Sequence, residues 1–156
     1  KIIARSAALV DVTIDTHASA RLSRAARATP RVANRLLKRT RDYAQVHPAP
    51  AQHPAKTNVT DEIARKTLAL MEIDAEGLEP MDRKILEVII AKFGGGPVGI
   101  QTIAAAVSEE NDTVEEMYEP YLMQLGFLER TPRGRVATQR AYAHLGIARP
   151  QKSLLG

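Results

Sequence analysis

The sequence contains no cysteine. A disulfide framework and a thiolate metal site are therefore excluded, and a reducing cytoplasm is the simplest setting for the chain. No apolar run approaches the roughly 18 residues that a membrane-spanning helix needs, and no signal-peptide core opens the sequence. We therefore expect a soluble, cytoplasmic protein without a membrane partner.

The chain also lacks the motifs of a complete enzyme. It has no G-x-x-x-x-G-K-[ST] phosphate loop, and Gly94-Gly95-Gly96 is followed by proline rather than by Lys-Ser or Lys-Thr. None of the 4 histidines has a spaced Ser or Asp partner, and His47 and His53 stand in a proline-rich segment without an adjacent carboxylate. We expect no catalytic residue, no metal site and no ATP hydrolysis by this chain alone.

The sequence does have an ordinary globular composition, with 44% hydrophobic and 26% charged residues over a length of 156. This length fits one mid-sized domain or two small ones. Residues 1–70 hold 13 Lys or Arg against 5 Asp or Glu, whereas residues 71–156 hold 9 against 13. A basic half suggests phosphate nearby, but basic side chains that merely solvate helix faces would give the same asymmetry. Because Lys1 rather than Met opens an apolar-periodic helix, the sequence reads as a fragment.

The first half is predicted to be a small bundle of four helices. One helix covers residues 1–10, and Asp15 is placed to cap the N-terminus of the next. Thr29 and Pro30 are an N-cap and a first-turn proline, and the long amphipathic helix that follows leaves its basic residues outside. After a proline-rich loop, residues 47–56, Thr60 caps a fourth helix. Its predicted inward residues are Ile63, Leu68, Leu70 and Met71.

An acidic segment with Gly and Pro, residues 74–80, separates two periodic regions. We place the boundary there and predict domains of 1–74 and 75–156. Three helices are predicted in the second domain, from about Asp82, from Ile100 to Val107, and after an N-cap at Thr113, the last with Met117 inward. Two short strands about a Pro/Gly turn and a final helix, residues 139–145, follow. The order of three helices and a hairpin is that of a winged helix, so the fold class is mainly α with a small β-hairpin wing.

Several segments closely resemble the RuvB branch-migration ATPases, and together they span nearly the whole chain. They are Thr29–Leu37, Met81–Leu86, Lys92–Gly99, Tyr118–Leu122 and Gly126–Arg135. The resemblance implies a small helical AAA+ lid domain followed by a winged-helix head. It further implies a C-terminal part of an ATP-dependent motor that moves Holliday junctions in DNA recombination and repair.

The resemblance also implies cofactors, partners and one site residue. ATP or ADP would be the nucleotide, with Mg²⁺ held by a large ATPase domain that this chain does not contain. The partners would be DNA, a RuvA-type junction-binding protein and other copies of the protein in a hexamer. Arg31 occupies the position of the lid arginine that reaches the nucleotide phosphates, the sensor 2 residue. A guanidinium in the first turn of a helix suits phosphate, although a solvated arginine would give the same pattern.

The wing is the expected DNA contact, because Arg130, Arg133 and Arg135 lie on one hairpin. A solvated turn is the alternative. Glu115, Glu116 and Glu119 make the third helix of this domain acidic, so we do not expect it in a major groove. The head should therefore follow the DNA backbone without reading sequence.

Two other functions remain open from the residues alone. A free-standing winged-helix transcription regulator would need a basic recognition helix, and a protein-docking module using the acidic surface would not bind DNA. The sequence also departs from the family in two places. The 47–56 loop looks longer than usual, and Asn111 stands where the family often has an arginine that touches DNA.

Overall fold

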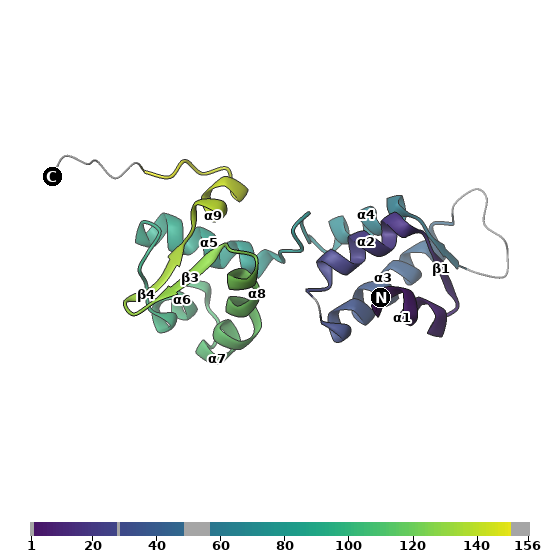
Figure 1. Cartoon of the computed structure of the whole chain (residues 1–156), viewed down its shortest axis with the longest axis horizontal. Helices are drawn as coiled ribbons and strands as arrows, with labels where there is room; N and C mark the ends of the chain where they lie inside the picture. The colour runs from purple at the N-terminus through teal and green to yellow at the C-terminus, as the bar shows by residue number, and fades with distance from the viewer. Residues whose placement is uncertain (1, 28, 49–56, 151–156) are drawn as a thin grey trace. The chain divides into compact units, whose positions relative to one another are not determined.

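The computed structural model describes residues 2–27, 29–48 and 57–150. They form two compact units, Lys1–Glu79 and Pro80–Gly156 (Figure 1). The division falls inside the acidic segment 74–80. Each unit has its own apolar core, as expected of small domains that fold separately.

The first unit is a helical bundle with one short pair of strands. Its elements are α1 (Ile2–Leu9), β1 (Val12–Ile14), α2 (Thr16–Ala25), α3 (Pro30–Val46), β2 (Thr57–Val59) and α4 (Asp61–Leu70). Helix α2 packs against α4, and α3 packs against both α1 and α4 (Figure 1). The four predicted helices are confirmed. The largest fully buried side chains of this core are Ile3, Leu22, Leu36, Leu37 and Val59.

Asp15 ties two helix N-termini of this unit together. Its Oδ1 accepts a hydrogen bond from the backbone N–H of Ala18 at 2.6 Å, which is the predicted cap of α2. Its Oδ2 accepts from the backbone N–H of Asp61 at 2.8 Å, in the first turn of α4. The hydroxyl of Thr60 accepts from Ile63 N–H at 3.4 Å, so the second predicted cap is also confirmed. One carboxylate therefore satisfies donors in two helices that are remote in sequence.

The sequence did not predict that β1 and β2 pair in parallel, with Val12 opposite Thr57 and Ile14 opposite Val59. Strands of three residues are too short to show a periodicity. The pairing places Asp15 beside the N-terminus of α4, because the N–H of Asp15 donates to the carbonyl of Val59, two residues before that helix, at 3.1 Å.

Beside this junction, Arg21 binds Asp61 through two hydrogen bonds of 2.7 and 2.9 Å. The side-chain hydrogen bonds from the guanidinium hold the pKa of Asp61 below its ordinary value.

The predicted start of α3 is confirmed, with Thr29 as the N-cap residue and Pro30 as the first residue of the helix. The hydroxyl of Thr29 donates to the carbonyl of Arg27 at 3.0 Å and makes no hydrogen bond to the helix N-terminus. The predicted inward position of Leu70 in α4 was wrong. Leu70 is 71% exposed. Helix α4 buries Ile63, Ala64, Thr67 and Leu68, and at 100° per residue Leu70 lies about a quarter turn from the middle of that face.

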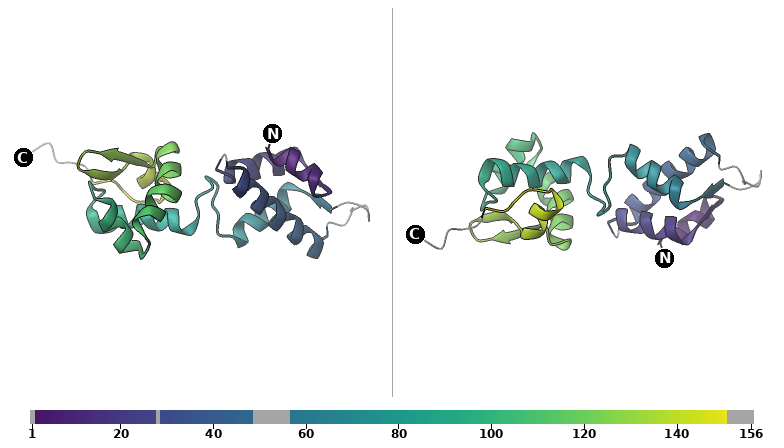
Figure 2. Two further views of the ribbon diagram at one scale, coloured as in Figure 1. Left: turned by 90° about the horizontal axis from the view of Figure 1, so that it is seen from below. Right: turned by 90° about the horizontal axis from the view of Figure 1, so that it is seen from above.

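The second unit is a winged helix. Its elements are α5 (Pro80–Phe93), α6 (Ile100–Val107), α7 (Asn111–Thr113), a π-helical segment η1 (Val114–Tyr118), α8 (Glu119–Gln124), β3 (Leu128–Thr131), β4 (Gly134–Ala137) and α9 (Gln139–His144). The mainly α fold class, with its hairpin wing, is confirmed. The hairpin lies beside helices of its own unit, with β3 against α8 and β4 against α5 (Figure 2). The core is built around Leu86, Ile89, Ile103, Leu122 and Phe127.

The third helix of this unit begins earlier than predicted and is irregular. It starts at Asn111 after the N-cap residue Glu110, so Thr113 lies inside it and is not a cap. The N–H of Glu119 donates to the carbonyl of Val114, five residues back, and Pro120 has no N–H with which to continue a regular α-helix. The wider turn changes which residues face inward. Met117, predicted to be inward, is 64% exposed, whereas Glu119 is buried.

The Gly94–Pro97 segment was predicted to end the first helix of this unit. It also leads the chain to Val98, which adds a further pairing to the sheet of the wing. Val98 forms a bridge to the free edge of β4, with Val98 N–H donating to Arg135 O at 3.0 Å and Arg135 N–H to Val98 O at 2.8 Å. Gly96 has φ of +90°, and a Cβ there would collide with the carbonyl of Arg135. Glycine is therefore required where the two backbones meet.

Along the described ranges, no helix is both long and apolar enough to cross a membrane.

Candidate nucleic-acid interface

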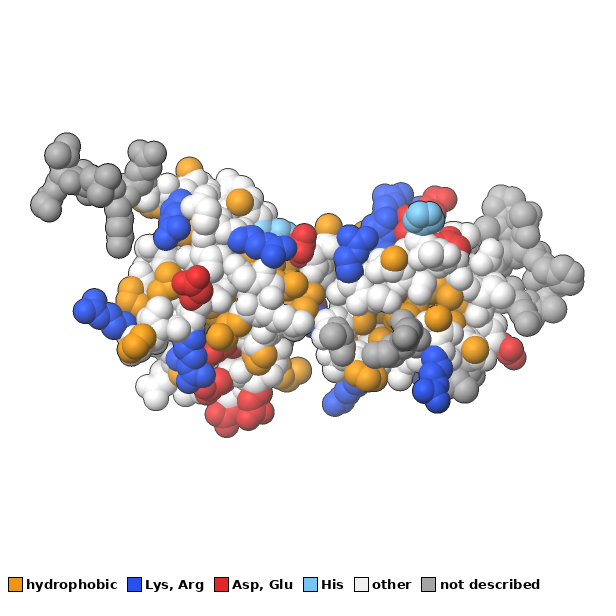
Figure 3. Space-filling view, viewed as in Figure 1, with side chains coloured by type: hydrophobic (Ala, Val, Ile, Leu, Met, Phe, Trp, Pro, Cys, Tyr) orange, Lys and Arg blue, Asp and Glu red, His pale blue; other side chains and the backbone are white. Residues whose placement is uncertain are grey.

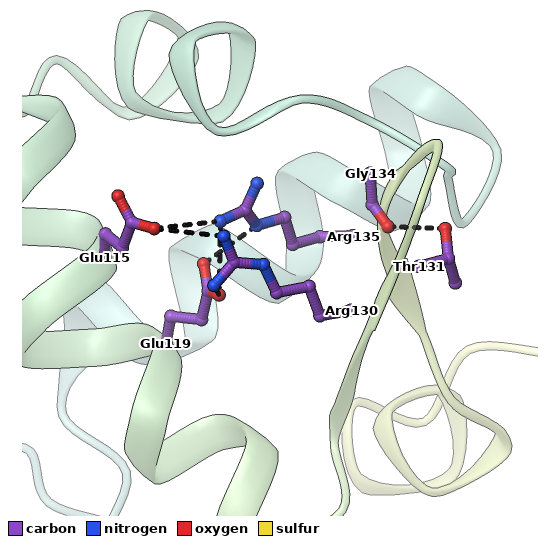
Figure 4. Close-up of polar contacts among 6 residues, drawn as sticks. All are labelled: Glu115, Glu119, Arg130, Thr131, Gly134 and Arg135. Atoms are coloured by element: carbon purple, nitrogen blue, oxygen red, sulfur yellow. Dashed lines mark hydrogen bonds and ion pairs between the residues drawn. The ribbon is translucent and has the colours of Figure 1, made fainter.

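The hairpin register separates the three wing arginines into two groups. Arg130 on β3 lies directly opposite Arg135 on β4, so both side chains leave the same face of the hairpin. Leu128 and Ala137 share that face and are buried. Arg133 stands apart in the turn between Thr131 and Gly134, where the hydroxyl of Thr131 donates to the carbonyl of Gly134 at 2.7 Å. The strands thus direct Arg130 and Arg135 toward the helices (Figure 4). Arg133 lies in the turn, at the tip of the hairpin.

Arg135 is held in a buried ion pair. Its Nε donates to Oε2 of Glu119 at 2.9 Å and its Nη2 to Oε1 at 3.2 Å. Only 9% of the Arg135 side chain and 3% of the Glu119 side chain are exposed. Breaking such a pair would leave a buried charge without compensation, at a cost of about 3–5 kcal/mol. The geometry therefore does not support the predicted phosphate contact of Arg135 and gives this residue a structural role.

Arg130 is held less firmly. Its Nη2 lies 3.3 Å from Oε1 of Glu115, and its Nη1 lies 3.8 Å from Oε1 of Glu119. The side chains of Arg130 and Glu115 are 55% and 41% exposed. The two arginines that face each other across the hairpin are thus matched by two glutamates from η1 and α8 (Figure 4). Without these carboxylates, like charges opposite one another would destabilise the strand pair.

Arg133 is exposed, and its side chain makes no hydrogen bond or ion pair to the described part of the chain. It edges a cleft of about 550 Å³ between the hairpin and the start of α6. The other walls of the cleft include Gly99, Ile100, Gln101 and Thr102, which form the N-cap and first turn of that helix. A guanidinium beside the positive end of a helix suits a phosphate group.

Acidic side chains gather on another part of the same unit, over α7 (Figure 3). The exposed or half-exposed carboxylates of this stretch are Glu109, Glu110, Asp112, Glu115 and Glu116. Asn111 is exposed at the first position of α7 and adds no positive charge. This surface repels a phosphate backbone, so the helix is not suited to a major groove.

In the first unit, Arg31 is the second residue of α3. It is exposed and makes no hydrogen bond or ion pair to another described residue. Arg35, one turn later, is instead paired with Glu79 at 2.8 Å. Lys38 and Arg39 are exposed as well, so exposure alone does not distinguish Arg31. What distinguishes it is its place in the first turn, where no side chain caps the helix N-terminus.

Sequence reasoning missed the role of Glu119. Glu119 was predicted only as one of the residues that make the third helix acidic, whereas the structure buries it and pairs it with Arg135. The sequence held a signal that could have indicated this role. A two-residue turn in the hairpin puts residues 130 and 135 opposite each other, so two arginines face each other across the strands. Two facing arginines need an acidic partner.

Across residues 2–27, 29–48 and 57–150, the structure has no group of three or more His, Asp or Glu that could hold a metal ion. His53 and the proline-rich positions 49–56 lie outside the described residues.

Two family models divide the chain between them. Residues 1–74 match the RuvB AAA lid domain, and residues 75–146 match the RuvB C-terminal winged helix domain. These are the two kinds of domain that the resemblance implied.

Curated relatives and solved structures agree with these models. The chain is 52% identical over 154 residues to the Holliday junction branch migration complex subunit RuvB of Chloroflexus aggregans, and 51% identical to that of Chloroflexus aurantiacus. The match covers 99% of this chain but 42% of each relative, so the chain spans less than half of their length. The structure of the Thermotoga maritima RuvB Holliday junction branch migration motor matches with a TM-score of 0.87 and 46% identity, over 95% of this chain and 47% of that one. The chain therefore belongs to the RuvB family and consists of its lid domain and its C-terminal winged-helix domain.

Proposed function

We propose that this chain is the nucleotide-sensing and DNA-binding part of an ATP-dependent motor that drives branch migration at Holliday junctions. The support is its match to RuvB proteins over both units. The rest of the motor, including the phosphate loop and the Mg²⁺ ligands, would belong to a large ATPase domain outside the 156 residues.

In the head, we propose that the wing tip binds the phosphate backbone of DNA. The observation that carries this proposal is the exposed Arg133 at the tip of a hairpin that the Arg135–Glu119 ion pair fixes to the helices. Arg130 is half exposed beside it and can supply a second contact. Phosphate contacts carry no sequence information, and the acidic third helix is not suited to reading bases in a major groove, so binding should be independent of sequence.

In the lid, we propose that Arg31 contacts the phosphates of ATP or ADP. It has the charge, the exposure and the helix-start position that such a contact needs. Since Arg31 is one contact and no phosphate loop is present, the chain alone should not turn over ATP.

The proposed partners follow from the same family membership. They are DNA at a four-way junction, a RuvA-type junction-binding protein reached through the missing domain, and identical subunits in a hexameric ring. DNA repair in bacteria takes place in the cytoplasm, which is the proposed location. A free-standing transcription regulator is not favoured, because both units match RuvB and the third helix of the head carries acidic rather than basic residues.

The DNA contact can be tested with Arg133→Ala, using Arg133→Lys as a charge-conserving control. Binding of the complete chain to two duplexes of unrelated sequence is measured over a range of salt concentrations. Each phosphate contact that is lost lowers the slope of log K against log salt by about 0.9. We expect Arg133→Ala to weaken binding equally on both duplexes and to flatten the slope by about that amount, whereas Arg133→Lys keeps most of both.

Wild-type affinity and slope in Arg133→Ala would mean that the wing tip is not the DNA contact. A duplex preference in the wild type would favour the regulator, and absence of binding at low salt would favour a protein-docking module.

A further inference from the structure

The charges behind the wing form an inner and an outer ion pair of different character. The inner pair, Arg135 and Glu119, is buried on both sides and joined by two hydrogen bonds. The outer pair, Arg130 and Glu115, has both side chains more than two-fifths exposed and a single contact of 3.3 Å (Figure 4). Exposed pairs of this kind exchange readily with solvent and with other charges.

We propose that Glu115 limits the affinity of the wing for DNA by competing with phosphate for the guanidinium of Arg130, an inference that rests on the proposed DNA contact. Both a carboxylate and a phosphate oxygen accept charge-assisted hydrogen bonds from arginine. Arg130 cannot satisfy both with the same donors at full strength. The free energy that Arg130 gains by binding a phosphate is therefore partly offset by the loss of its contact with Glu115.

The geometry allows Arg130 to leave Glu115 at low cost. Oε1 of Glu115 also lies 3.5 Å from Nη2 of Arg135, so Glu115 keeps a positive neighbour after Arg130 moves away. Its side chain is 41% exposed and can be hydrated as well. Arg135 has no such freedom, because moving it away would leave the buried carboxylate of Glu119 without the positive partner to which it is hydrogen-bonded. Arg130 is thus the exchangeable arginine of the cluster.

Arg130 also lies where a phosphate would meet it. It lines the same cleft as Arg133, together with the first turn of α6. A phosphate held by Arg133 at the mouth of this cleft would attract the Arg130 guanidinium away from Glu115. Such a competition lowers the affinity of the wing for DNA without abolishing binding. A lower affinity suits a protein that must release one position of the DNA backbone before it binds the next.

The test compares Glu115→Gln with Glu116→Gln in the complete chain. Glu116 is the matched control, because it is exposed on the same segment, carries the same charge and forms no ion pair with any described residue. Both variants are titrated with one duplex over a range of salt concentrations, in wild-type and Arg130→Ala backgrounds.

We expect Glu115→Gln to tighten binding roughly two- to fivefold at low salt and to steepen the slope of log K against log salt by up to about 0.9. Glu116→Gln should give a smaller gain without the change in slope. In the Arg130→Ala background, the two glutamine variants should have the same effect. This dependence on Arg130 separates a competition from the general removal of a negative charge.

An equal effect of the two variants in the wild-type background would overturn the inference. Weaker binding in Glu115→Gln would do so as well, because Glu115 would then support the wing rather than restrain it. If Arg133→Ala leaves binding unchanged while the Glu115 variant behaves as expected, the tip contact fails but the competition at Arg130 stands.

Discussion

At the scale of single residues, the lid depends on polar contacts that connect remote segments. Asp15 is the clearest case, since its two oxygens accept from Ala18 in α2 and from Asp61 in α4. Its neighbour Arg21 adds a half-exposed ion pair to Asp61. Capping by Asp15 could be predicted from the local pattern, but its second bond could not. That bond depends on the pairing of β1 with β2, which are remote in sequence and leave no local signature.

Asp15→Ala should therefore cost more than an ordinary cap. A single lost N-cap costs about 1 kcal/mol, and here two backbone donors lose their acceptor, so we expect about 2 kcal/mol. Asp15→Asn keeps one acceptor oxygen and should fall between the wild type and Asp15→Ala. Urea unfolding of the wild-type chain and of each variant gives the loss in the free energy of unfolding for Asp15→Ala and for Asp15→Asn. If Asp15→Ala costs only about the 1 kcal/mol of a single N-cap, the second bond, to Asp61 in α4, contributes nothing to stability.

At the scale of elements, periodicity predicted the long helices and failed where backbone geometry departs from a regular repeat. The spacing of apolar residues was sufficient for α3, α5 and α6. It placed Met117 inward because it assumed α-helical turns, whereas η1 widens the helix before Pro120. The same change accompanies the burial of Glu119, which pairs with the wing. The element that positions the candidate DNA contact was therefore the one that periodicity described least well.

The wing also depends on the glycine-rich segment before it, and two glycines allow a matched comparison. Gly94 and Gly96 both have positive φ, but a Cβ at Gly94 meets nothing, whereas one at Gly96 meets the backbone of Arg135. Gly94→Ala should cost about 1–2 kcal/mol of folding free energy from backbone strain alone. Gly96→Ala should cost at least about 1 kcal/mol more, and it should also weaken DNA binding because the edge of β4 must move. Equal unfolding free energies would show that the contact with Arg135 is easily relieved.

At the scale of the whole molecule, each unit has its own proposed function. Arg31 is exposed in the lid and Arg133 in the head, and we propose that the first contacts a nucleotide and the second contacts DNA. The division into two domains and the winged-helix order followed from composition and element order. The assignment to a branch-migration motor did not, because spacing and charge alone left a regulator and a docking module open. It came from the specific segments shared with RuvB, and the comparisons then showed family membership.

The most direct test is ATP-driven branch migration of a four-way junction by a full-length RuvB protein whose lid and head are these two domains. Arg31→Ala and Arg133→Ala are compared with the wild type, and ATP hydrolysis is followed in the same reactions. We expect Arg31→Ala to lose both hydrolysis and migration. Arg133→Ala should keep hydrolysis measured without DNA and lose most of its migration rate. Wild-type migration by both variants would contradict the account, because neither the lid contact nor the wing contact would then serve the motor.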